Sequence, residues 1–113
     1  MIKEFIVNPF FKNYGPFSVS EILKILKINS INTDRKKVHD IKDLSNSSEK
    51  EITFFHSKKY KNLANKTKAS FCITTNSLKK ELPNNCIPLI VENVLVSTSL
   101  ITTKFYPDSV DDS

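Results

Sequence analysis

Two short apolar runs constrain the fold of this chain more than any other feature of its sequence. Residues 69–74 and 87–91 are predominantly apolar, and polar residues bound both runs. A short run of this kind is typical of a strand that is covered on both faces of its sheet. The two runs therefore predict an α/β domain, in which helices pack against a buried sheet.

The first predicted helix begins at a capping box. Ser18 is followed three residues later by Glu21, a pair that satisfies the free N–H groups of a helix start. The next residues supply an apolar face at helical spacing, formed by Ile22, Leu23, Ile25 and Leu26. We expect a helix from residue 19 to about residue 27.

Further strands and helices alternate along the rest of the chain. Residues 38–41 and 51–55 have strand composition, and Ser57 is suited to cap a helix over residues 58–65. Residues 93–105 contain many β-branched side chains, yet their apolar positions repeat at helical spacing, so we expect a helix there. Together with the length of 113 residues, this order predicts one small, compact mixed-sheet domain with flanking helices.

Composition and charge exclude several classes of function. The net charge of +5 is compatible with nucleic acid, a membrane surface or an acidic protein, but the lysines spread along the whole chain and form no nucleic-acid-binding motif. No segment has the length of a membrane helix, and we expect a cytoplasmic protein. Cys72, Cys86, His39 and His56 lack metal-ligand spacing, so we expect no metal and no cofactor.

One junction between a predicted strand and a predicted helix is the best candidate for a binding site. Ligands of α/β sheets gather beyond the carboxyl ends of strands, near helix N-termini. Phe54 and Tyr60 would flank such a crevice and hold a planar base, while Ser57 reads its edge. Nearby cations suited to the phosphates are Lys58, Lys59 and Lys61. The competing interpretation is that both rings only cover the sheet.

The succession of motifs resembles the N-terminal domain of the UDP-3-O-(3-hydroxyacyl)glucosamine N-acyltransferases of lipid A biosynthesis in Gram-negative bacteria. The resemblance covers nearly the whole chain, and the motifs that carry it are Gly15-Pro16-Phe17, Asp40-Ile41, Glu51-Ile52-Thr53-Phe54-Phe55, Lys59-Tyr60, Thr67-Lys68-Ala69-Ser70, Leu89-Ile90-Val91-Glu92-Asn93 and Phe105-Tyr106-Pro107. That domain resembles the uridine-binding domains of some cell-wall ligases. The resemblance implies that Phe54 and Tyr60 sandwich a uracil, with Ser57 where the family usually has Asn.

The resemblance also implies how the domain serves the reaction. In the family, the 2-amino group of UDP-3-O-acylglucosamine takes a 3-hydroxyacyl group from acyl carrier protein. A left-handed β-helix supplies the catalytic His, the carrier-protein contacts and the homotrimer. We expect residues 1–107 to form the sugar-nucleotide domain and residues 108–113 to begin a linker to that catalytic domain. The isolated chain is then expected to be an inactive monomer without catalytic residues of its own.

A second class of function stays open at the level of sequence. A non-catalytic interaction module could use the basic surface to bind an acidic partner, and Phe54 and Tyr60 would then be structural. Selective binding of a uridine nucleotide separates this alternative from the sugar-nucleotide domain.

Overall fold

A four-stranded parallel sheet is the centre of the fold. The computed structural model describes residues 11–29 and 35–109. The strands lie in chain order and are β3 (Asp40–Ile41), β4 (Glu51–Phe54), β5 (Phe71–Thr74) and β6 (Ile87–Ile90). A separate antiparallel pair consists of β1 (Phe17–Ser18) and β2 (Lys37–Val38). Strands of both directions are thus present, divided between two sheets.

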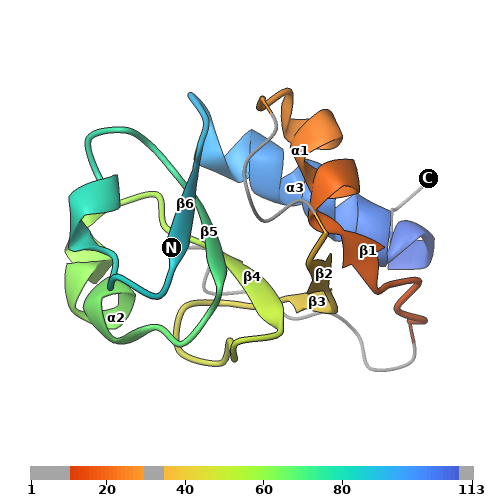
Figure 1. Cartoon of the computed structure of the whole chain (residues 1–113), viewed down its shortest axis with the longest axis horizontal. Coiled ribbons are helices and arrows are strands. Elements are labelled where there is room, and N and C mark those ends of the chain that lie inside the picture. The colour runs from red at the N-terminus through yellow and green to blue at the C-terminus, as the bar shows by residue number, and fades with distance from the viewer. Residues whose placement is uncertain (1–10, 30–34, 110–113) are drawn as a thin grey trace.

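Helices cover both sides of the main sheet. They are α1 (Val19–Leu26), α2 (Lys61–Lys66) and α3 (Val94–Phe105), with short 3-10 turns η1 (Lys58–Tyr60), η2 (Lys79–Glu81) and η3 (Pro107–Ser109). Figure 1 shows α1 and α3 together on one side of strands β4 to β6, and α2 on the other side. The expected α/β class with flanking helices is confirmed.

Side-chain alternation along the strands divides the core into two clusters. Ile52 and Phe54 of β4 point towards α1 and α3, whereas Phe55 points towards α2. The larger cluster includes Ile22, Leu26, Ile73, Leu89, Ile101 and Phe105. The smaller one consists of Leu44, Phe55, Ala64, Cys72 and Cys86, and Tyr60, Leu78 and Leu82 pack against it. Both faces of the sheet are therefore buried, as the apolar runs predict.

Most of the expected elements are present, with one change in pairing. The capping box of Ser18 and Glu21 opens α1, and α3 forms despite its β-branched residues. The strand expected over residues 38–41 is divided at His39, because the chain there leaves β1 and joins β4. The His39 N–H donates to the Lys50 carbonyl at 2.9 Å, after which β3 runs parallel to β4.

The C-terminal end of α3 is tied to the beginning of the described chain. The Tyr14 N–H donates to the Phe105 carbonyl at 2.8 Å, and the Tyr106 hydroxyl donates to Asp40 at 2.7 Å. Gly15 is the only glycine of the chain. A Cβ at Gly15 would lie 2.6 Å from Cε1 of the Phe105 ring, so only glycine fits between this turn and the helix.

None of the helices within residues 11–29 and 35–109 is long and apolar enough to cross a lipid bilayer.

Replacing Gly15 with alanine should destabilise the fold by roughly 1–3 kcal/mol, because the added methyl group clashes with the buried ring of Phe105. Urea unfolding of Gly15→Ala and the parent protein measures the difference. In a Phe105→Leu background the same substitution should cost less, because the nearest ring atom is gone. An equal cost in both backgrounds would show that the contact with Phe105 is not the cause.

Candidate functional site

The carboxyl ends of three parallel strands bring polar residues to one edge of the sheet. His56 and Ser57 follow β4, Thr75 follows β5, and Asn93 follows β6. Because the strands are parallel, these positions share one edge, which is where ligands of α/β sheets usually bind. We refer to this region as the carboxyl-edge site.

A pocket of about 230 Å³ opens at this edge, and α3 begins in its wall. Its lining residues are His56, Thr75, Glu92, Asn93, Val94 and Leu95. The Asn93 side chain accepts a hydrogen bond from the Val96 N–H at 3.0 Å and so caps α3. The Glu92 carboxylate disfavours a bare anion beside it. The lining therefore suits a neutral group that forms hydrogen bonds better than a phosphate.

His56 is the side chain of this pocket with an unused polar atom. Its Nδ1 is buried, and no described residue forms a hydrogen bond with it. Burial lowers the pKa of His56 from its ordinary value of 6.5, because the imidazolium loses hydration. At neutral pH the ring is uncharged and retains one nitrogen as an acceptor. The His56 ring centroid lies 5.9 Å from that of Tyr60, with the rings tilted by 36°.

The two predicted stacking residues lie in different parts of the core. Phe54 is fully buried in the larger cluster, on the side of α1 and α3. Tyr60 is half-buried and packs against the smaller cluster, on the side of α2. The structure therefore does not bring Phe54 and Tyr60 to one open crevice. It brings His56 beside Tyr60 instead, and the role of Phe54 in uracil binding stays a prediction.

The other predicted site residues surround Tyr60. The Ser57 hydroxyl accepts a hydrogen bond from the Lys59 N–H at 3.3 Å and caps η1, as expected for a residue at a helix start. The Lys59 ammonium lies 5.6 Å from the Tyr60 ring centroid, within the range of a cation–π contact. Lys58 and Lys61 are exposed on the same turn. These three exposed lysines supply positive charge for an anionic ligand beside Tyr60.

Three residues of this edge were not predicted as site residues from the sequence. They are Thr75, Glu92 and Asn93, which lie within two residues of the end of a predicted strand, so the rule that places ligands beyond strand ends could have found them. Within the described part of the chain, no group of three or more His, Cys, Asp or Glu side chains is placed to hold a metal ion. Both cysteines are buried free thiols.

Comparisons with known proteins identify the family of this chain. The family model of UDP-3-O-(3-hydroxymyristoyl) glucosamine N-acyltransferase, LpxD, matches residues 36–103. UDP-3-O-acylglucosamine N-acyltransferases of Rickettsia typhi and Rickettsia prowazekii are 31% and 30% identical to this chain over 105 residues. The protein of that name from Rickettsia canadensis is 31% identical over 101 residues.

These relatives are much longer than the chain. The match with the Rickettsia typhi and Rickettsia prowazekii proteins covers 89% of this chain and 30% of each relative. For the Rickettsia canadensis protein the shares are 86% and 29%. The chain thus corresponds to less than a third of each of these proteins. The family match spans the whole four-stranded sheet and nearly all of α3, and the chain belongs to the LpxD family of N-acyltransferases.

Proposed function

We propose that this chain is the sugar-nucleotide-binding domain of an N-acyltransferase that acts on UDP-3-O-acylglucosamine. The observation that carries the proposal is the family match over residues 36–103, which includes the segment from Phe54 to Tyr60. The relatives bear the name UDP-3-O-acylglucosamine N-acyltransferase. In such a reaction the 2-amino group of the glucosamine attacks an acyl thioester, and the thiol leaves.

In this proposal the chain contributes binding and not the chemical step. The carboxyl-edge site offers hydroxyl groups and a neutral imidazole, and Tyr60 beside His56 offers an aromatic ring, which together suit recognition of a planar heterocycle. We expect the uracil to lie against Tyr60, with Ser57 or His56 at its polar edge. Lys58, Lys59 and Lys61 then approach the diphosphate. The acyl transfer is proposed to require the remaining length of the family proteins.

Phe54 can join this site only if its ring leaves the core. Its side chain is buried with Ile52 and Ile73 in the larger cluster. Moving a ring of that size into water costs several kcal/mol, because each Å² of apolar surface that becomes exposed costs about 25 cal/mol. We therefore assign the main stacking contact to Tyr60, and Phe54 a supporting role beneath the strand end.

UMP should bind the labelled chain saturably and shift the NMR signals of residues 54–60, whereas AMP should not. Tyr60→Ala should weaken UMP binding by at least about fivefold, since stacking on one aromatic ring contributes roughly 1–3 kcal/mol. Tyr14→Ala is a matched control, because Tyr14 is 46% exposed and lies near the end of α3. Equal responses to UMP and AMP, or a Tyr60→Ala variant that binds normally, would refute the proposal.

Ser57→Asn should tighten UMP binding, because an amide presents a donor and an acceptor on two separate atoms, which can pair with two groups of the uracil edge. A serine hydroxyl has only one oxygen for both roles. Asparagine is also a good helix cap, so η1 should keep its start. Ser57→Ala removes both the cap and the hydroxyl and should weaken binding. The NMR titration with UMP ranks the three proteins. If Ser57→Asn leaves the affinity unchanged, Ser57 does not face the base.

The neutral state of His56 predicts a loss of stability in acid. Because burial lowers its pKa in the folded chain, the unfolded chain takes up the proton first as the pH falls below about 6.5. The free energy of unfolding should therefore decrease between about pH 7 and pH 5, and part of this decrease should vanish in His56→Gln. His39→Gln is the control and should retain it. Urea unfolding at both pH values gives the comparison.

A further inference from the structure

The positive charge of the chain is concentrated in one half of the fold. Residues 52–91 carry seven lysines and one acidic residue, a net charge of +6. The remaining residues carry ten basic and eleven acidic side chains, a net charge of −1. The lysine-rich segment includes α2 and η2, which lie together at the end of the molecule away from α1 and α3 (Figure 1). The lysines themselves are spread along the chain, and the excess of positive charge in this segment arises because it holds a single acidic residue.

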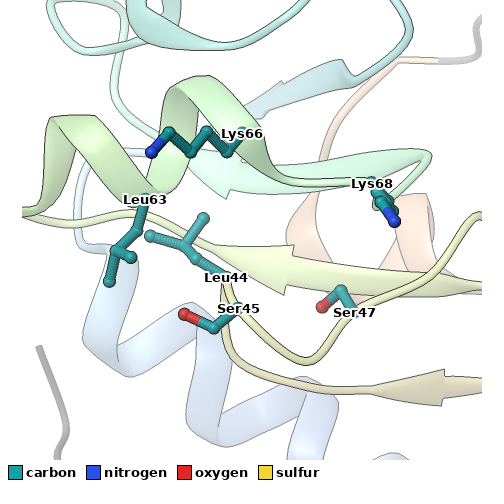
Figure 2. A pocket seen from close by; sticks show the side chains of 6 residues that line it. All are labelled: Leu44, Ser45, Ser47, Leu63, Lys66 and Lys68. Atoms are coloured by element: carbon teal, nitrogen blue, oxygen red, sulfur yellow. The ribbon is translucent and has the colours of Figure 1, made fainter.

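A pocket of about 380 Å³ lies beside α2 in this basic half. We call it the α2 pocket, and its lining residues are Leu44, Ser45, Ser47, Leu63, Lys66 and Lys68. Figure 2 shows Leu44 and Leu63 close together, with the Lys66 ammonium above them and Lys68 apart from them, beyond Ser47. The pocket therefore has an apolar middle and two separated cations.

The lining offers no acidic counterpart to these cations. None of its six residues is acidic, and Asp43, which precedes Leu44, is engaged with the backbone N–H and the amide of Asn46. The Ser47 hydroxyl donates to backbone carbonyls. Ser45 is exposed. The pocket thus presents positive charge beside an apolar surface, and Lys68 also borders a neighbouring pocket that Glu49 and Lys50 line.

The structure of α2 explains why a lysine is favoured at position 66 but not why one lies at position 68. Lys66 lies in the last turn of α2, where a cation is favoured by the helix carbonyls. Lys68 lies outside the helix and gains nothing from it. Leu63 is 38% exposed, although Leu44 beneath it is fully buried. An exposed leucine in a pocket that lysine side chains also line is the pattern of a polar-rimmed contact surface.

We propose that the α2 pocket docks an acidic segment of a partner protein, in which an apolar side chain lies between two carboxylates. The apolar side chain would cover Leu63, above the buried Leu44, and the carboxylates would reach Lys66 and Lys68. A small anion alone would leave the exposed surface of Leu63 uncovered. Nucleic acid fits less well, because no aromatic ring lines the pocket for base stacking.

This surface is separate from the proposed nucleotide site. Lys66 and Lys68 precede β5 and lie towards the amino-terminal edge of the sheet, whereas His56, Thr75 and Asn93 lie at the carboxyl edge. The two proposals therefore rest on different residues. If uridine nucleotides fail to bind, the proposal for the α2 pocket is unaffected. If the acidic peptide fails to bind, the proposal for the nucleotide site is unaffected.

A short synthetic peptide that alternates glutamate and leucine is the probe, titrated into the full chain at low ionic strength and followed by NMR. Signals of Leu44, Leu63 and Lys66 should shift. Lys66→Gln and Lys68→Gln should each weaken binding about two- to fivefold, the range of an exposed ion pair. Leu63→Ser should also weaken it. The matched controls are Lys24→Gln in α1 and Leu100→Ser in α3, which remove an exposed lysine and an exposed leucine on the other side of the sheet. Neither should weaken peptide binding.

Three results would overturn the proposal. The first is the absence of shifts around the α2 pocket at millimolar peptide. The second is an equal loss of binding in Lys24→Gln and Lys66→Gln, which would mean that only net charge matters. The third is tighter binding of a single-stranded DNA oligonucleotide or of phosphatidylglycerol vesicles that does not depend on Leu63, which would assign the surface to a different class of partner.

Discussion

The burial of a parallel sheet on both faces is the constraint on which the rest of this structure depends. Strands β3 to β6 run in one direction, so the chain must cross back between them, and the crossings supply covering structure. Adjacent side chains on β4 then enter different clusters. Phe54 stabilises the contact with α1 and α3, and Phe55 stabilises the contact with α2. Neither helical layer can be removed without exposing one face of the sheet.

The same topology separates two kinds of surface. The strands of the main sheet end at one edge, where the chain turns into η1 after β4, into η2 after β5 and into α3 after β6, and where His56, Thr75 and Asn93 line one pocket. The return segment from α2 to β5 delivers Lys66 and Lys68 towards the other edge. A ligand at the first edge and a partner at the second need not compete. The compact fold thus has room for two contacts within about a hundred residues.

The sequence predicted the elements well where local chemistry decides them. The capping box of Ser18 and Glu21 is enough to locate α1, and the apolar spacing of residues 93–105 correctly outweighed strand propensity. In α3 the hydroxyl of Thr102 donates to the Thr98 carbonyl at 2.8 Å, which helps a β-branched residue to fit a helix. The motif order also identified the family that the comparisons show.

Features that depend on tertiary packing were harder to predict. In a sheet with one open face, either Phe54 or Phe55 would be exposed, but helices cover both faces here and bury both rings. The proximity of His56 to Tyr60 depends on how tightly η1 turns after β4, which no spacing in the sequence specifies. The two lysines of the α2 pocket meet Leu44 only through the packing of α2 against the loop after β3.

The excess of positive charge in residues 52–91, which include α2 and η2 at the end of the described fold away from α1, makes the charge distribution of the described residues asymmetric. An asymmetric charge distribution experiences a torque in the field of a charged object, over a range set by a Debye length of about 8 Å at physiological ionic strength. An approaching acidic surface would therefore rotate the protein before contact, so that α2 faces it first. The segregation of charge would in this way select one orientation from many random encounters.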